Sequence, residues 1–342
     1  MRSEAKQIPA SISCHKDLID ESVKGFLAEW DGDLSQMVKY HLGLDGDDKN
    51  PTVNGKAVRP CLALFTTEAC GGEPEDTLPA AVSLELIHNF SLVHDDIQDN
   101  AELRRGKKSL RAIWGDDQAI NAGDGIRELA CLALTRLGSN SRPEITLQAL
   151  DILCACSYRM IEGQVTDMQF EKSTSISPPE YLEMVEKKTC ALLECAFQLG
   201  GLYSRLGFSE KLIQFGRHLG YLYQIRDDYL GIWGNSSKLG KSAENDLLKK
   251  KKSYPIVHAF SKAAGSHRKR LAEIYESPDR MKPDEIEEVR DILHSLNVQG
   301  DAQQIATEHW TQAREILDDI PFPDWADEEM RKFGRFLLYR ER

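Results

Sequence analysis

The spacing of apolar residues constrains the fold of this chain more than any other feature of its sequence. In four long segments, apolar side chains recur every three or four positions, which is the period of an α-helix. These segments are residues 78–99, 144–170, 178–207 and 210–234. Turn-forming clusters such as "CGGEPEDT" and "LGSNSRPE" separate them, and no stretch shows the strict alternation of a half-buried strand. The pattern predicts an all-α protein.

Several of these expected helices are apolar on more than one face, which is typical of central helices buried in a large bundle. The length of 342 residues would suit one large domain or two ordinary ones. We find no internal repeat, sustained heptad or low-complexity tract. We therefore expect one all-α domain over residues 1–342, with residues 1–50 as a variable N-terminal segment.

The charge and the cysteines exclude several functional classes. A net charge of −12 disfavours nucleic acid and anionic membranes as partners, so an anionic ligand would need a local cluster of cations. The eight cysteines show neither CxxC pairs nor metal-finger spacing, and we expect reduced, buried thiols. No apolar run is long enough to span a membrane, and the first residues lack the apolar core of a secretory signal. We expect a cytoplasmic protein.

Two clusters of aspartates stand out within the expected helices. In "SLVHDDIQDNAELRRGKKS" (residues 91–109), Asp95 and Asp99 are four positions apart and therefore lie on one helix face, about 6 Å apart along the axis. The second cluster is "YQIRDDYLG" (residues 223–231), which contains Asp227 and Asp228. A single such motif is more often a surface cluster, but two in helical context, each followed by basic residues, favour a function.

Two helices that each present paired aspartates could hold divalent metal ions between them. Ligands that are all oxygen favour Mg²⁺ or Mn²⁺ over zinc, and Mg²⁺ usually takes part of its coordination from water and substrate phosphates. Cations near the aspartates would bind the same phosphates. The candidates are Arg104, Arg105, Lys188 and Lys241.

These segments resemble the trans-isoprenyl diphosphate synthases, a family that includes the farnesyl and geranylgeranyl diphosphate synthases. The resemblance runs from about residue 50 to the end of the sequence and keeps the family's motif order. It is carried by "NGKAVRP", "ELIHNFSLVHDDIQDNAELRRG", "WGDDQAINAGD", "EKKTCALLE", "YQIRDDYLGIWG" and "LGKSAENDLLKKKKSYP". Within the family, the sequence is most similar to bacterial geranylgeranyl diphosphate synthases. The resemblance implies an all-α homodimer of the isoprenoid synthase type, with a deep central cavity.

The resemblance also implies a role for each matching residue. The metal ligands would be Asp95, Asp99 and Asp227, supported by Asp96 and Asp228, with Mg²⁺ or Mn²⁺ bound as three ions per active site. The allylic diphosphate would be bound by Arg104, Lys188 and Lys241. The diphosphate of isopentenyl diphosphate would be bound by Lys56, Arg59, His88 and Arg105. Thr189 and Gln224 would lie beside the developing carbocation.

The chain departs from the family pattern in its glycine-lysine motif and in its second aspartate motif. Asn54 and Ala57 replace a glycine and an arginine, and Gly231 replaces an aspartate found in many relatives, although one bacterial subgroup of geranylgeranyl-type synthases also has glycine there. Product length is expected to depend on Phe90 and Ser91, five and four positions before Asp95. An aromatic residue followed by a small one is most similar to synthases that make a twenty-carbon product, and a fifteen-carbon product comes next.

Two other functions remain open at this point. A terpene cyclase on the same fold ionises an allylic diphosphate but would not need Lys56, Arg59, His88 and Arg105 together. A non-catalytic subunit of a heteromeric synthase would be expected to have lost one aspartate pair.

Other residues have plainer expectations. Arg340 and Arg342 could fold over the site, but we expect a frayed, exposed tail there. We expect a mostly solvated run Lys249–Lys252 with one lysine turned inward. Gln164 and Asp167 are expected to give structural support. Asp116 and Asp117 are expected to be surface acids.

Overall fold

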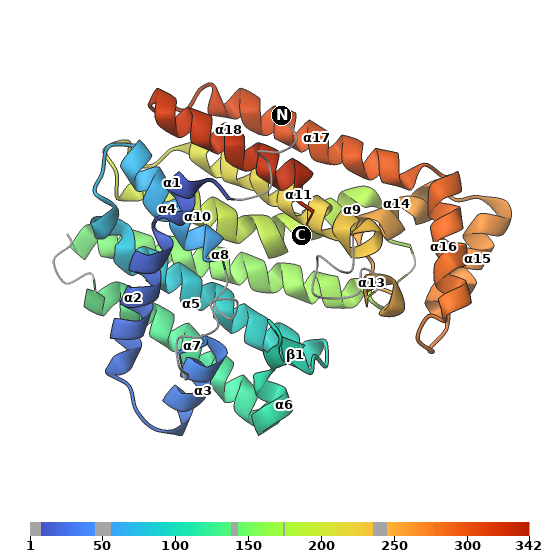
Figure 1. The fold of residues 1–342 in the computed structure, drawn as a ribbon, viewed down its shortest axis with the longest axis horizontal. Coiled ribbons are helices and arrows are strands. Elements are labelled where there is room, and N and C mark those ends of the chain that lie inside the picture. The colour runs from blue at the N-terminus through green and yellow to red at the C-terminus, as the bar shows by residue number, and fades with distance from the viewer. Residues whose placement is uncertain (1–7, 45–55, 138–142, 174, 235–244, 342) are drawn as a thin grey trace. The chain divides into compact units, whose positions relative to one another are not determined.

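Helices make up nearly all of the regular structure of the chain in the computed structural model (Figure 1), which confirms the prediction of an all-α protein. The structure describes residues 8–44, 56–137, 143–173, 175–234 and 245–341. Two compact units can be distinguished. The N-terminal unit comprises Pro9–Ser157 and Cys195–Ile213, and the C-terminal unit includes Tyr158–Glu194 and Gln214–Arg342. That residues 1–342 form a single domain stays a prediction.

The N-terminal unit begins with short helices and then builds its core from longer ones. Its elements are α1 (Ala10–Ser13), α2 (Lys16–Ala28), α3 (Asp33–His41), α4 (Val58–Ala69), α5 (Pro74–Gln98), β1 (Leu103–Arg104), β2 (Lys107–Lys108), α6 (Leu110–Trp114) and α7 (Asp116–Leu137). Helix α5 packs along α7 and also contacts α4 (Figure 1). Phe65, Leu84 and Leu86 are among the fully buried side chains. Helix α5 is therefore the central helix that positions the first aspartate cluster.

Three helices contribute residues to both units: α8 (Pro143–Phe170), α10 (Ala191–Leu202) and α11 (Glu210–Trp233). The other elements of the C-terminal unit are α9 (Pro178–Val185), η1 (Glu186–Cys190), α13 (Asn245–Leu248), α14 (Tyr254–Lys262), α15 (Gly265–Glu276), α16 (Pro283–Ser295), α17 (Val298–Leu317) and α18 (Asp324–Tyr339). Helix α17 contacts α14, α16 and α18. Buried side chains of α14, α15 and α16, among them Phe260, Leu271 and Val289, share one apolar cluster.

Local sequence signals explain where key helices begin. Helix α5 starts with Pro74 in its first turn, followed by Glu75 and Asp76, where a missing N–H costs nothing and negative charge is favoured. Helix α9 starts at a capping box, in which the Ser177 side chain accepts from the Glu180 backbone N–H and the Glu180 carboxylate accepts from the Ser177 backbone N–H.

Among the described helices, none is both long enough and apolar enough to cross a lipid bilayer.

One small element departs from the helical prediction. Strands β1 and β2 pair antiparallel, with Leu103 opposite Lys108 and Arg104 opposite Lys107. The two residues that connect them, Arg105 and Gly106, both have positive φ, 50° and 80°. Positive φ at both central positions matches the tight turn that suits the twist of a two-residue hairpin. Two-residue strands are too short for alternation to reveal them in the sequence.

Candidate active site

The first aspartate cluster lies at the C-terminal end of α5, in the N-terminal unit. The backbone N–H of Asp99 donates to the Asp95 carbonyl at 2.8 Å, so the helical path continues through Asp99 and both carboxylates share one face. Asp95 is half-buried and Asp99 is exposed. Two carboxylates at this spacing repel each other unless a cation lies near them. The geometry therefore suits a pair of oxygen ligands.

Asp96 lies between them in sequence but points the other way, and only 2% of it is exposed. The Nε of Arg104 donates to both carboxylate oxygens of Asp96, at 2.9 and 3.1 Å, and Nη2 of Arg104 also donates to Asp96. Because Arg104 is the β1 residue beside the hairpin turn, this ion pair ties the hairpin to α5. Sequence analysis assigned Arg104 to a diphosphate and did not foresee its pairing with Asp96.

Arg59 and His88, two of the four residues assigned to isopentenyl diphosphate, lie together in the N-terminal unit. The Nη1 of Arg59 is 3.2 Å from Nε2 of His88. Burial, followed by the charges of Arg59 and Arg105, holds the pKa of His88 well below its usual value, so the imidazole is neutral and accepts from the guanidinium. Lys56 is exposed just before α4, and Ala57, at the N-cap of α4, has a left-handed backbone with φ 45°.

Polar residues that sequence analysis missed surround this cluster. Burial raises the pKa of Glu85, whose carboxylate accepts from Nδ2 of Asn89 at 2.8 Å and lies in the field of Arg105 and Arg59. His41 is buried at the end of α3, and burial together with Arg105 and Arg104 lowers its pKa to about 3. A signal for Glu85 was present, because Glu85, His88 and Asn89 interrupt an apolar run at helical spacing.

The second aspartate cluster lies on α11, in the C-terminal unit, and again one carboxylate is buried and one is not. Asp228 is 4% exposed and accepts from the Tyr181 hydroxyl, from the Tyr254 backbone N–H at 2.9 Å and from Nε2 of Gln224 at 2.9 Å. Burial raises the pKa of Asp228 to about 6, although these hydrogen bonds act in the opposite direction. Asp227 is exposed.

Lys188 and Thr189 lie in η1, a single π-helical turn between α9 and α10. Such turns break the normal helical register and are frequent at functional sites. Thr189 Oγ1 donates to Oε1 of Gln224 at 2.7 Å, which brings together the two residues assigned to the carbocation. Lys188 pairs with Asp167 on α8, and a structural role for Asp167 stays a prediction.

The expectation of a frayed tail is wrong for Arg340, which is only 6% exposed. Its guanidinium contacts Asp227 and lies over the ring of Tyr223, because α18 carries it onto α11. In the run Lys249–Lys252 one lysine is turned inward, as expected: Lys252 is buried against Tyr275. Asp116 and Asp117 are exposed, which confirms that prediction. Asn54, Lys241 and Arg342 lie outside the described residues.

The donors available for a metal ion fit a hard divalent cation. Within the described part of the chain, no group of three or more His, Cys, Asp or Glu side chains is placed to hold an ion by itself. Asp99 and Asp227 are exposed and Asp95 is half-buried, and each offers carboxylate oxygens as possible ligands. This suits Mg²⁺ or Mn²⁺, which complete their coordination with water and substrate phosphates, and does not suit zinc. All eight cysteines are free thiols, and four of them are buried.

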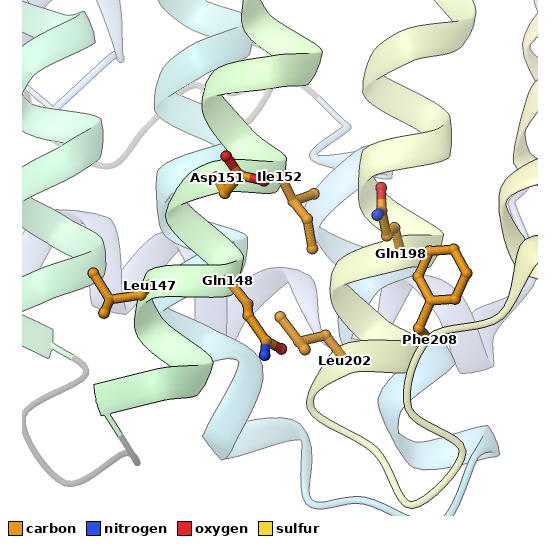
Figure 2. Close-up of a pocket in the computed structure, with 7 residues that line it drawn as sticks. All are labelled: Leu147, Gln148, Asp151, Ile152, Gln198, Leu202 and Phe208. Carbon is orange, nitrogen blue, oxygen red and sulfur yellow. The ribbon is translucent and has the colours of Figure 1, made fainter.

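A separate pocket of about 460 Å³ lies in the N-terminal unit, and Figure 2 shows the residues around it. Those residues are Leu147, Gln148, Asp151, Ile152, Gln198, Leu202 and Phe208. They include no lysine or arginine, and the one charged residue among them is an aspartate. A diphosphate group therefore has no counter-ion there, and this pocket is not a candidate site for one.

Helical aspartate pairs accompanied by arginine, lysine and histidine define a class of enzyme that handles diphosphates with divalent ions. Comparison with known proteins gives the family. The sequence profile of the polyprenyl synthetase family matches residues 48–293. The chain belongs to this family and is a trans-isoprenyl diphosphate synthase, a transferase of prenyl groups.

Its relatives extend over nearly the whole chain. It is 33% identical to a (2E,6E)-farnesyl diphosphate synthase of Mycobacterium bovis, over 95% of this chain and 91% of that protein. It is 35% identical to a short chain isoprenyl diphosphate synthase of Methanothermobacter thermautotrophicus, over 96% and 97% of the two chains. Among solved structures, geranylgeranyl pyrophosphate synthetase from Pyrococcus horikoshii matches with a TM-score of 0.86 and 33% identity, over 97% and 98% of the chains.

Proposed function

We propose that this enzyme joins isopentenyl diphosphate to an allylic diphosphate and releases a geranylgeranyl diphosphate. The observation that supports this most strongly is that both aspartate pairs are kept, each with one carboxylate reachable from solvent and one locked in the fold. The three relatives reported above are named as short-chain synthases, but their names differ in product length.

The reaction needs the allylic carbon–oxygen bond to break, which leaves negative charge on the departing diphosphate. Divalent ions held by Asp95, Asp99 and Asp227 would neutralise part of that charge. Lys188 would add a cation on the same diphosphate, together with Arg104 and Lys241, and fixed charges of this kind stabilise a developing anion without reorganising. Arg104 can do so while it remains paired with Asp96, because a guanidinium has five N–H donors.

Thr189 and Gln224 would stabilise the allylic cation. Because the Thr189 hydroxyl donates its hydrogen to Gln224, the lone pairs of its oxygen are left to face the cation. Gln224 is itself oriented by its hydrogen bond to Asp228. The proton lost after coupling would pass to the released diphosphate.

Arg59 and His88, with Lys56 and Arg105, would hold isopentenyl diphosphate. The neutral imidazole of His88 accepts from Arg59 and so orients its guanidinium. A cyclase that uses one allylic substrate would not need this second set of residues, so their retention favours elongation.

Product length is assigned to Phe90 on α5. Its ring is 6% exposed and meets the His94 ring edge-on at 5.4 Å, while the Ser91 hydroxyl donates back to the His88 carbonyl. We expect Phe90→Ala to shift the product toward longer chains and Ser91→Ala to leave it unchanged. The product ratio is read within one sample, so it does not depend on how much of the variant folds.

The test is incubation of the purified protein with Mg²⁺, labelled isopentenyl diphosphate and, separately, dimethylallyl, geranyl and farnesyl diphosphates. Products are separated by chain length after phosphatase treatment. Labelled twenty-carbon alcohol from each primer is expected. Labelled product that stops at fifteen carbons would mean a farnesyl diphosphate synthase, which the Mycobacterium relative also suggests. Unlabelled hydrocarbon from an allylic substrate alone would overturn the proposal in favour of a cyclase.

We also propose that the enzyme is a homodimer. On the part of α8 that belongs to the C-terminal unit, Tyr158, Ile161, Val165 and Met168 are all exposed. Their spacing of three and four residues makes one apolar stripe on the helix, and a soluble monomer rarely leaves such a stripe to water. A second copy of α8 presents the same stripe and would cover it symmetrically. The cytoplasmic location and the count of three ions per site stay predictions.

A further inference from the structure

Arg340 is unusually buried for an arginine, although the carboxylate that it contacts is exposed. It follows α18 directly, its backbone N–H donates to the Phe336 carbonyl at 2.8 Å, and it is 6% exposed. Lysine and arginine are seldom this buried unless their charge is paired. The position therefore needs an electrostatic reason.

That reason lies on one face of α11. The Nη2 of Arg340 donates to the Tyr223 carbonyl at 3.1 Å and to Oδ1 of Asp227 at 3.2 Å, and the guanidinium lies 4.4 Å from the centre of the Tyr223 ring. Arg226 completes the contact, because its Nε and Nη2 donate to the Arg340 carbonyl at 3.0 and 2.8 Å. Tyr223, Arg226 and Asp227 are spaced by three and four residues and share a face.

The pairing with Asp227 is close but incomplete. Asp227 has a side chain that is 58% exposed, so solvent and solutes reach its carboxylate. The Nε of Arg340 is buried and has no hydrogen-bond acceptor among the described residues. A guanidinium that leaves a buried donor unsatisfied is held less firmly than one with all its donors paired. The contact is therefore suited to exchange.

We propose that Arg340 is an internal counter-ion that occupies the carboxylate of Asp227 before a divalent ion binds, and that it is displaced when the ion arrives. The inference rests on the proposed role of Asp227 as a metal ligand. A divalent ion and a guanidinium on the same carboxylate repel each other, so the two cations compete. Arg340 thereby lowers the affinity of Asp227 for the ion and links ion binding to release of Arg340 from α11.

The first experiment measures binding without turnover. Free Mn²⁺ is followed by electron paramagnetic resonance in titrations of the protein, with inorganic diphosphate present to supply phosphate oxygens. We expect Arg340→Met to bind Mn²⁺ about five-fold more tightly than the wild type, because one partly exposed ion pair no longer competes. Arg340→Lys keeps the charge and should bind less tightly than Arg340→Met. Arg335→Met removes one positive charge from an exposed position of α18, five residues before Arg340, and should bind as the wild type does.

The second experiment measures how fast the backbone amides around Arg340 exchange their hydrogens with solvent. Hydrogen exchange of peptides covering residues 336–341 should become faster in the wild type when Mn²⁺ and diphosphate are added. In Asp227→Asn these peptides should exchange at one rate with and without the ion.

The outcomes separate this inference from the proposed function. If Asp227→Asn binds as many Mn²⁺ ions as the wild type, Asp227 is not a ligand and both fail. If Asp227→Asn loses a site while Arg340→Met binds Mn²⁺ no more tightly than the wild type, the metal assignment holds and the counter-ion role is wrong. A wild-type tail whose exchange does not change on ion binding would also overturn it.

Discussion

At the scale of single residues, the two members of each aspartate pair have different tasks. Neighbouring residues of a helix point about 100° apart, so one aspartate faces solvent while the other faces the fold. Asp96 and Asp228 are the buried members and are held by hydrogen bonds to the protein. Asp95 and Asp227 are the more exposed members, and we propose that they bind the ion.

This division predicts that substitution of an exposed member lowers activity, whereas substitution of a buried member lowers stability. Asp95→Asn and Asp227→Asn should lower kcat by about two orders of magnitude or more, with little change in Tm, because a transition-state charge loses its counter-ion. Asp228→Ala should lower the free energy of unfolding by about 1–3 kcal/mol, because Tyr181 and Tyr254 lose their buried acceptor. Steady-state kinetics and thermal melts check both. Near-normal kcat in Asp95→Asn would contradict the metal assignment.

Lys252 predicts a pH dependence of stability. Burial lowers its pKa to about 8, while the aromatic rings of Tyr275 and Phe260 lie within 6 Å of its ammonium group. A lysine whose pKa is lower in the folded state contributes stability above its unfolded pKa of about 10.5, and this stability is lost as the pH falls toward 8. The free energy of unfolding of the wild type, minus that of Lys252→Met, should therefore rise between pH 7.5 and 10, by at most about 2 kcal/mol.

Urea denaturation at several pH values measures this difference, in which the other titrating groups cancel. Lys249→Met is the control, because Lys249 is exposed in the same run of lysines. A difference that stays flat with pH for Lys252→Met would mean that the folded protein accommodates the charged amine without cost.

At the scale of elements, close packing of α8 on η1 fixes the π-helical turn. A Cβ on Gly163 would lie 2.2 Å from the backbone N of Lys188 and 2.6 Å from its Cα. Backbone atoms cannot move aside as a flexible side chain can, so the two helices would have to separate. Gly163 thus permits the approach that places Lys188 and Thr189.

We expect Gly163→Ala to lower the free energy of unfolding by about 1–3 kcal/mol through overpacking, and to lower kcat because η1 shifts. Gly25→Ala is a matched control in α2, where an added Cβ meets nothing within 4 Å. That variant should gain about 0.5–1 kcal/mol, the usual advantage of alanine over glycine in a helix. If both variants were equally stable, the contact with Lys188 would not restrain α8.

The elements also show where prediction from sequence succeeds. Long periodic segments identified α5, α8 and α11, because burying one helix face sets the spacing of apolar residues directly. The pairing of Lys188 with Asp167 and of Arg340 with Asp227 joins residues 21 and 113 positions apart. Such contacts depend on how helices pack, which periodicity does not encode. The hairpin and η1 were missed because a few residues carry no periodic signal.

At the scale of the whole molecule, the site motifs were readable because each needs a fixed residue type at a fixed local spacing. Asp95 and Asp99, or Thr189 within "EKKTC", depend on one helix or one turn for their relative placement. Glu85 and His41 were harder to assign, since their roles follow from neighbours contributed by other elements. Assembly of two chains is still harder to predict from the sequence, because it depends on which side chains are exposed once the helices have packed.

The apolar stripe on α8 gives the prediction at this scale. Val165→Glu places a charge in the middle of the stripe formed by Tyr158, Ile161, Val165 and Met168, and burying an unpaired carboxylate in an apolar interface is costly. Gln312→Glu adds the same charge at an exposed position of α17, outside the stripe. Sedimentation velocity over a range of concentrations should show a dimer for the wild type and for Gln312→Glu, and a monomer or a much weaker dimer for Val165→Glu. A Val165→Glu variant that stays fully dimeric at low concentration would mean that the two copies meet on another surface, and the exposed side chains of α8 would then need a different partner.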